Sequence, residues 1–151
     1  PFGVLDIKKD SEEKLRQSGV DYCIVRPTGL ANKNWPSGSR PMFSQGDVAA
    51  GRITREDLAT VLVDVLSEPE ATGKTFEVLT VAGYPPAFSI GPALARLSLD
   101  SDGPPSLESV RATYSAMQQL LPGEKQDSAG IALGQTYEEL DKGVTGRFGE
   151  R

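Results

Sequence analysis

Two residues near one apolar run have side chains or backbone suited to binding a ligand. Arg26 follows Tyr22-Cys23-Ile24-Val25, and its guanidinium can pair with a phosphate or a substrate carboxylate. A structural salt bridge to a loop carboxylate is an alternative of at least equal weight. Gly29 lets the backbone come close to a ligand, or it serves only as a tight exit from a strand. The end of this run is therefore a candidate binding region.

Other chemistry is excluded by composition. The chain has no histidine, which removes histidine general bases, Ser-His-Asp triads and histidine-ligated zinc, and we predict no metal site. Its one cysteine, Cys23, cannot form a disulfide within the chain and is interpreted as a small buried apolar residue. The net charge is −5 and the basic residues are scattered, so nucleic acid is not an expected partner.

Three glycines near the end of the chain have the spacing of a phosphate-binding loop. Gly143, Gly146 and Gly149 form a G-x-x-G-x-x-G pattern. That motif binds phosphate only between a strand and a helix, and neither is indicated here. We interpret the segment as a flexible tail.

The first half of the chain alternates helical and strand patterns. Residues 6–18 are mostly good helix formers ending before Gly19, which predicts a largely solvated helix with a glycine cap. The run 22–25 predicts a strand buried on both faces of a parallel sheet. Residues 28–51, with isolated Trp35, Met42 and Phe43, read as a long ordered excursion at the end of that strand.

A second helix and strand follow. Thr54 and Asp57 have the spacing of a capping box, after which apolar residues recur at helical spacing from Leu58 to Leu66. We expect Arg55 and Asp57 to organise the start of this helix. Residues 74–81 alternate and favour a strand. The order of elements predicts an α/β fold in which the two strands are parallel.

Residues 82–151 read as an extended, irregular arm, because proline and glycine interrupt its short apolar runs. One helix is predicted around 107–121, beginning after Ser106. The arm has too little apolar content for a core of its own, so we expect it to bind a protein partner or larger complex. Its proposed anchors are Tyr84, Phe88, Tyr114, Met117, Tyr137 and Phe148.

No apolar run is long enough to span a bilayer, although docking to a membrane complex is compatible with the sequence. The first residues, Pro1-Phe2-Gly3, carry neither an initiator methionine nor a signal peptide. We therefore expect that the chain begins after processing or truncation.

Three segments together resemble one family. Residues 8–30 run KKDSEEKLRQSGVDYCIVRPTGL, which resembles a stretch of the atypical short-chain dehydrogenases, in their NAD(P)H-binding or NmrA-like branch. Residues 53–63, ITREDLATVLV, and the strand that starts at Lys74 resemble segments further along that family. The resemblance covers roughly the first eighty residues and does not extend into the arm.

The resemblance implies a Rossmann-like fold, of which residues 1–81 would be the C-terminal half and 82–151 an appended arm. The glycine-rich first turn that binds the pyrophosphate in such folds has no counterpart, so NAD(P) is expected only if an N-terminal half is present. Lys8 matches the lysine of the family's Tyr-x-x-x-Lys pair, as a tentative catalytic and cofactor-binding residue; a merely solvated lysine is the alternative. Val4 stands in the tyrosine position. The remaining cofactor-binding residues implied are Pro27, Thr28, Gly29 and Leu30.

Two functions follow from this pattern. One is an NAD(P)-binding oxidoreductase-like protein with altered or weak chemistry. The other is a non-catalytic structural or assembly subunit of a larger complex, such as a thylakoid photosynthetic complex, docked through its arm. The resemblance further suggests an intracellular location, in the chloroplast, because related proteins recur there. Enzymatic activity itself is left open by the sequence.

Overall fold

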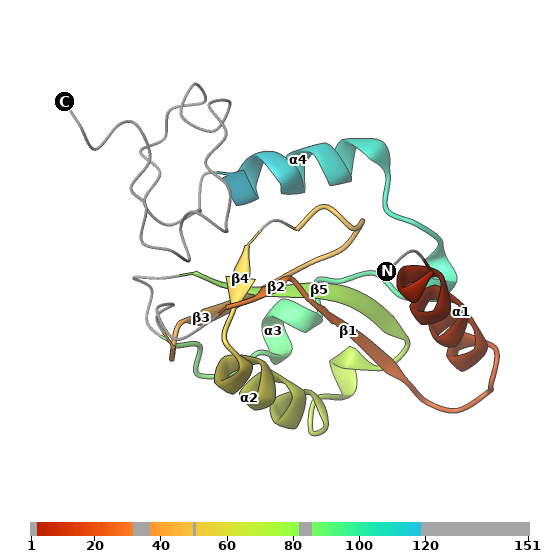
Figure 1. Cartoon of the computed structure of the whole chain (residues 1–151), viewed down its shortest axis with the longest axis horizontal. Helices are drawn as coiled ribbons and strands as arrows, with labels where there is room; N and C mark the ends of the chain where they lie inside the picture. Colours follow the sequence, from red (N-terminus) through yellow and green to blue (C-terminus); the bar gives the residue numbers. More distant parts are fainter. Residues whose placement is uncertain (1–2, 32–36, 50, 82–85, 119–151) are drawn as a thin grey trace.

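The fold is a small mixed sheet with helices on both of its faces (Figure 1). The computed structural model describes residues 3–31, 37–49, 51–81 and 86–118. The elements, in chain order, are α1 (Val4–Arg16), β1 (Cys23–Pro27), β2 (Gly29–Leu30), β3 (Arg40–Ser44), β4 (Arg52–Ile53), α2 (Arg55–Val65), β5 (Lys74–Val81), α3 (Gly91–Leu94) and α4 (Leu107–Gln118).

Strand β5 is the centre of the sheet. β1 runs parallel to its first half, with Cys23 opposite Lys74 and Pro27 opposite Val78. β3 runs antiparallel to its second half, β4 meets it antiparallel at Thr80, and β2 lies parallel to β4. The predicted α/β class and the parallel pairing of the two main strands are therefore confirmed, in an architecture consistent with a Rossmann-like fold.

The stretch after β1 is more regular than expected. Residues 28–51 were predicted to form a long excursion, but they include β2 and β3. Phe43 of β3 packs edge-to-face on Phe76 of β5, with ring centroids 5.3 Å apart, and this contact is invisible to local sequence patterns. Trp35, the third expected anchor of the stretch, lies outside the described residues.

The prediction that β1 is buried on both faces is wrong. Only Ile24 of this strand is buried, and Cys23 and Val25 are half-buried. The reason is that β1 stands at one end of the strand order among the described residues, so its outer edge has no neighbouring strand there. An apolar run therefore indicated a strand but not its place in the sheet.

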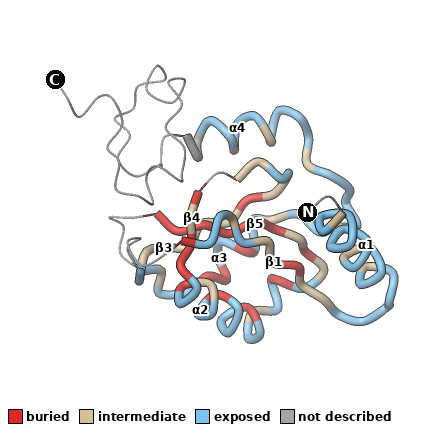
Figure 2. Tube along the Cα trace, in the orientation of Figure 1, coloured by how far each residue is buried: buried red, intermediate tan, exposed pale blue. Residues whose placement is uncertain are grey.

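The main core lies between β5 and helices α2 and α3 (Figure 2), on the face to which Phe76 and Val78 point. On the same face the ammonium group of Lys74 donates to the carbonyl of Leu94 at 2.8 Å. Leu79 and Val81 point to the opposite face, into a smaller cluster. The buried members of the main core are Ile53, Val61, Val65, Ala71, Phe76, Val78, Ile90 and Leu94.

Helix α2 begins as the sequence predicted. The Thr54 hydroxyl accepts a hydrogen bond from the backbone N–H of Asp57 at 3.0 Å, which caps the first turn. Val61 and Val65 enter the core, whereas Leu62 and Leu66 are exposed. The buried stripe is thus narrower than the apolar pattern indicated.

Helix α1 is solvated, as predicted, since none of its residues is buried. It begins and ends two residues earlier than the predicted range of 6–18. Gly19 does adopt a left-handed conformation, with φ of 75°, but it lies in the connection beyond the C-cap residue Gln17.

The segment that follows β5 is not an extended arm throughout. Ile90 and Leu94 are 4% and 0% exposed and belong to the main core, because the short helix α3 folds back beneath the sheet. Helix α4 starts at Leu107 as predicted and is described to Gln118. Residues 119–151, with Tyr137, Phe148 and the three spaced glycines, lie outside the described residues, and so does Tyr84. The domain boundary at residue 81 stays a prediction.

The core position of α3 can be tested by one substitution and its control. Leu94→Ala should lower the free energy of unfolding by about 2–5 kcal/mol, because it removes a fully buried side chain. Phe88→Ala, at a side chain that is fully exposed, should change it by less than about 0.5 kcal/mol. Urea denaturation measures both values, and equal effects would contradict the assignment of α3 to the core.

Candidate functional site

The turn Pro27–Leu30 lies where β1 ends and β2 begins. The backbone N–H of Thr28 donates to the carbonyl of Val78 at 3.0 Å, and that of Ala31 donates to Ile53 at 2.9 Å. Pro27, Gly29 and Leu30 are exposed between these two anchors. The turn therefore presents a fixed backbone surface at the carboxyl end of a parallel strand, where ligands of α/β proteins usually bind.

A side chain fills the space beside Gly29. A Cβ atom at this position would collide with the guanidinium group of Arg52. Gly29 is not among the described residues with positive φ, so backbone conformation does not impose the glycine. The group that lies against Gly29 is a side chain of β4, and the expected approach of a ligand to this glycine stays a prediction.

Thr28 adds a polar atom behind this surface. Its hydroxyl is buried and has no hydrogen-bond partner within the described part of the chain. Buried hydroxyl groups are normally satisfied. The turn thus combines this hydroxyl with the exposed backbone of its neighbours and the apolar side chain of Leu30, which is 40% exposed. The spacing and type of these residues do not provide a phosphate-binding loop.

Lys8 lies on the solvated helix α1, and Val4 stands one turn earlier. Both side chains are exposed, Val4 by 52%. Among the described residues, no hydrogen bond or ion pair joins Lys8 to the Pro27–Leu30 turn. The joint site of Lys8 and the turn therefore stays a prediction, and valine offers no group that could transfer a proton.

Arg26 makes the structural salt bridge that sequence reasoning offered as its alternative. Its Nε and Nη2 donate to the two carboxylate oxygens of Glu12 in α1, at 3.0 and 2.6 Å. Asp47, in the loop before β4, is a more distant partner at 3.8 Å from Nη1. The main partner of the Arg26 guanidinium is therefore a carboxylate of a helix. A loop carboxylate, which was the expected partner, lies farther away.

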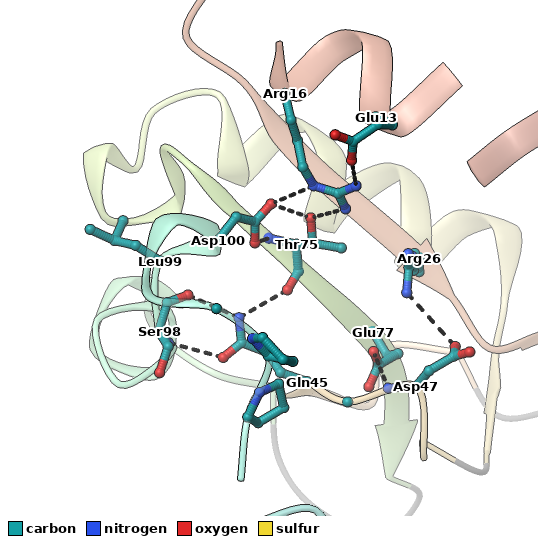
Figure 3. Close-up of a pocket in the computed structure, with 14 residues that line it drawn as sticks. Glu13, Arg16, Arg26, Gln45, Asp47, Thr75, Glu77, Ser98, Leu99 and Asp100 are labelled. Atoms are coloured by element: carbon teal, nitrogen blue, oxygen red, sulfur yellow. Dashed lines mark hydrogen bonds and ion pairs between the residues drawn. The ribbon is translucent and has the colours of Figure 1, made fainter. Parts of the chain in front are cut away.

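A second arginine, one turn after Glu12, fastens the C-terminal end of α1 (Figure 3). Arg16 Nε donates to Asp100 Oδ2 at 3.0 Å, and its Nη2 donates to the Thr75 hydroxyl at 2.9 Å. Asp100 also accepts from the backbone N–H and hydroxyl of Thr75, at 2.8 and 2.6 Å, and from the Tyr22 hydroxyl at 3.1 Å. Sequence reasoning missed Asp100, since 84 residues separate it from Arg16.

These contacts shift the ionisation of the groups that make them. The hydrogen bond from Arg26 lowers the pKa of Glu12. Burial opposes the ionisation of Asp100, but hydrogen bonds from Thr75 and Arg16 outweigh it and lower the pKa of this carboxyl group as well. Both carboxylates are therefore charged over a wider pH range in the folded chain than in the unfolded chain.

Cys23 has the opposite shift. Burial, helped by the negative charge of Asp100, raises the pKa of its thiol to about 11. The thiol remains protonated at neutral pH and is a poor nucleophile. It packs against the main core as a small apolar residue, but it is half-buried and not buried as predicted.

The attachment of α1 should weaken in acid. Because the folded-state pKa values of Glu12 and Asp100 are lowered, their contribution to stability is present at neutral pH and is lost as the pH falls below about 4. Glu12→Gln should lower Tm at neutral pH. The further decrease in Tm between neutral and acidic pH should be smaller in this variant than in the unchanged chain. The exposed Glu70→Gln serves as the control, and thermal melts followed by circular dichroism supply the measurement. An unchanged acid profile in Glu12→Gln would argue against this attachment.

The described ranges contain neither a metal-binding cluster nor a membrane-spanning helix. No group of three or more Cys, Asp or Glu residues there is placed to hold a metal ion. Among the helices of those ranges, none is both long enough and apolar enough to cross a membrane.

Comparison with known proteins points to one family. Residues 2–69 match a family model described as NAD(P)H-binding. An uncharacterised chloroplastic protein of Arabidopsis thaliana is 35% identical over 85 residues, which is 56% of this chain and 30% of the relative. The range matched by the family model contains α1 and the turn after β1.

Two further relatives match similar lengths. The chloroplastic protein High Chlorophyll Fluorescence Phenotype 173 of Arabidopsis thaliana is 38% identical over 76 residues, or 50% of this chain and 12% of that protein. An uncharacterised sugar epimerase of Bacillus subtilis is 30% identical over 71 residues, or 47% of this chain and 32% of that protein. The chain thus spans a third or less of the length of each relative.

Proposed function

Residues 2–69 belong to the NmrA-like NAD(P)H-binding family, and on this premise we propose that the chain provides the nicotinamide-side wall of an NAD(P) site. The observation that carries the proposal is the turn Pro27–Leu30. It is fixed to the sheet at both ends and exposes its backbone at the carboxyl end of β1. A flat ring can lie against such a surface without displacing side chains.

Each residue of this wall has a role suited to its chemistry. Lys8 donates hydrogen bonds to ribose hydroxyls, and Leu30 packs against the nicotinamide ring. The Thr28 hydroxyl, which lacks a partner in the described region, is a donor and acceptor for the edge of the ligand after a small rotation. A bound NAD(P) supplies hydride-transfer chemistry.

The position of Val4 limits the reaction. In this family the residue one turn before the lysine supplies a phenol, and here it is an alkyl side chain. Proton transfer at that point would need a group from the substrate or from solvent. Binding of the nucleotide, with weak or altered oxidoreductase chemistry, is the function that these residues support.

The open edge of β1 indicates how the site is completed. β1 pairs only with β5 among the described strands, and the first turn of α1 exposes Val4, Leu5 and Ile7 by 52%, 79% and 66%. Edge strands and exposed apolar stripes of this kind are usually covered. We infer that further polypeptide pairs with β1 and brings the pyrophosphate-binding turn.

Lys8 and Lys9 form a matched pair for testing the nucleotide site. Both are exposed on α1, and only Lys8 matches the family's lysine. In the protein as isolated from its source, Lys8→Met should weaken NADPH binding by about tenfold, the worth of a charge-assisted hydrogen bond, and Lys9→Met by less than about twofold. Fluorescence titration with NADH and NADPH measures this. Equal effects of both variants, or the absence of nucleotide binding, would refute the proposal.

Two equally exposed residues test whether α1 and β1 form a docking edge for further polypeptide. Ile7 and Val63 are each 66% exposed, on α1 and α2 respectively. If α1 and β1 receive further polypeptide, Ile7→Glu should lower the Tm of the natural protein by several degrees. Val63→Glu should change Tm little. A Tm that responds equally to both changes would speak against the edge as a docking surface.

A second candidate function is assembly of a larger complex through residues 82–151. The observation that favours it is helix α4, which exposes Leu107 and Tyr114 by 66% and 46%. Exposed aromatic and aliphatic side chains on one helix are typical of interaction sites. Because two relatives are named as chloroplastic proteins, we infer that the chloroplast is where such a complex would be found.

Native gel electrophoresis of an organellar extract tests this second candidate. The protein should migrate above its own mass, and the double substitution Leu107→Ser with Tyr114→Ser should return it to that mass. The control substitutes Val63 of α2 and the C-cap residue Leu66, which are exposed by 66% and 88%. A double variant that still migrates with the complex would remove the support for docking through α4.

A further inference from the structure

A cavity of about 430 Å³ lies on the face of the sheet opposite the main core. One wall is the last turn of α1, the floor is formed by Arg26 of β1 with Thr75 and Glu77 of β5, and the loop 45–47 and the segment 98–105 close it (Figure 3). Its volume is within the range of small-molecule sites. The Pro27–Leu30 turn is not part of its lining, so the cavity is separate from the proposed nucleotide wall.

The two arginines of the cavity are not available to an anion. Arg26 binds both oxygens of Glu12, and Arg16 binds Asp100 together with Glu12 and Glu13. An anionic ligand would have to displace these carboxylates while more carboxylates face it. The acidic residues in and around the cavity outnumber the arginines; they are Glu12, Glu13, Asp47, Glu77 and Asp100.

Glu77 is a buried carboxylate in the floor of the cavity, and Arg26, the residue opposite it on β1, is already bound to Glu12. Glu77 is 5% exposed, and its oxygens accept from the Ser44 hydroxyl at 2.7 Å and the backbone N–H of Asp47 at 3.0 Å. Both donors are uncharged. None of the ion pairs in the described ranges includes Glu77, although a buried charge is normally paired with a charge of opposite sign.

Asp47 is held beside Glu77 in an unusual conformation. Its φ is 58°, and it is the one non-glycine residue with positive φ in the described part of the chain. The hydrogen bond from its N–H to Glu77 fixes this turn, and Figure 3 shows the two residues together on the side of Arg26. Its carboxylate is 85% exposed and 3.8 Å from the nearest arginine nitrogen. Two carboxylates therefore face the cavity from adjacent positions.

We propose that this cavity binds an organic cation, a protonated amine or guanidinium on a short apolar stem, with Glu77 and Asp47 as its charge partners. Leu99, Pro104 and Pro105 line the opposite part of the cavity and contact the stem. A metal ion does not fit as well, because the described residues contain no group of three ligating side chains. The cation comes either from a basic side chain of a protein or from a free small amine.

Butyl compounds that differ only in the head group test the charge requirement. In NMR titrations of the 151-residue chain, n-butylamine should shift the backbone amides of Gly46, Asp47 and Gly103 in a saturable manner. n-Butanol and butyrate should bind about tenfold more weakly, since they lack the positive charge. Equal affinity of butylamine and butanol, or shifts that map to α2 and α3, would overturn the proposal.

Matched charge removals test the residues. Asp47→Asn keeps a residue type that tolerates positive φ and should weaken butylamine binding by about fivefold, as expected for an exposed ion pair. Asp64→Asn removes the same charge from α2, on the far face, and should leave binding within about twofold. Equal effects of the two variants would refute the site. Glu77→Gln, if folded by circular dichroism, should abolish saturable binding.

A lysine peptide distinguishes the two sources of the cation. An acetylated and amidated Gly-Lys-Gly peptide carries the same four-carbon stem and ammonium group as butylamine. If it binds as tightly as butylamine, the site accepts a basic side chain of a protein. If butylamine binds and the peptide does not, the site selects a free amine, and if neither binds the proposal fails.

Discussion

Helix α1 is attached to the sheet by charged side chains and not by apolar packing. None of its residues is buried, and its described links to the rest of the fold are the pairs of Glu12 with Arg26 and of Arg16 with Asp100 and Thr75. Bidentate and charge-assisted contacts of this type fix direction as well as distance. The rotation of α1 about its axis, and hence the direction in which Lys8 points, depends on these two arginines.

The central strand explains why such a polar attachment can exist next to a dry core. Alternate residues of β5 face opposite sides of the sheet. Phe76 and Val78 enter the main core with α2 and α3, while Thr75 and Glu77 face α1 and the cavity. One strand therefore separates the part of the molecule that provides stability from the part that carries its ionisable groups. Leu79 and Val81 then close the polar face with a second, smaller apolar cluster.

Local signals in the sequence were sufficient for the elements that depend on local physics. The Thr54 cap, helix α2 and strand β5 could be placed because their residues follow one period, and the family resemblance was confirmed by the match over residues 2–69. Strand β3 could not be predicted, because Pro41 and Ser44 are not typical strand residues and the strand is formed by its pairing with β5. Asp100 and Leu94 were missed for a similar reason: their partners are distant in the chain, and prolines around them indicated an irregular segment.

The close packing of Gly29 and Arg52 links two positions that are far apart in the sequence. The guanidinium of Arg52 fills the space that a Cβ atom at position 29 would need. A larger residue at 29 is compatible with the fold only if position 52 becomes smaller or its side chain takes another path. Because a guanidinium group at the end of a flexible side chain can move at small cost, a larger residue at 29 would redirect Arg52 and change the surface of the turn without being excluded by the fold.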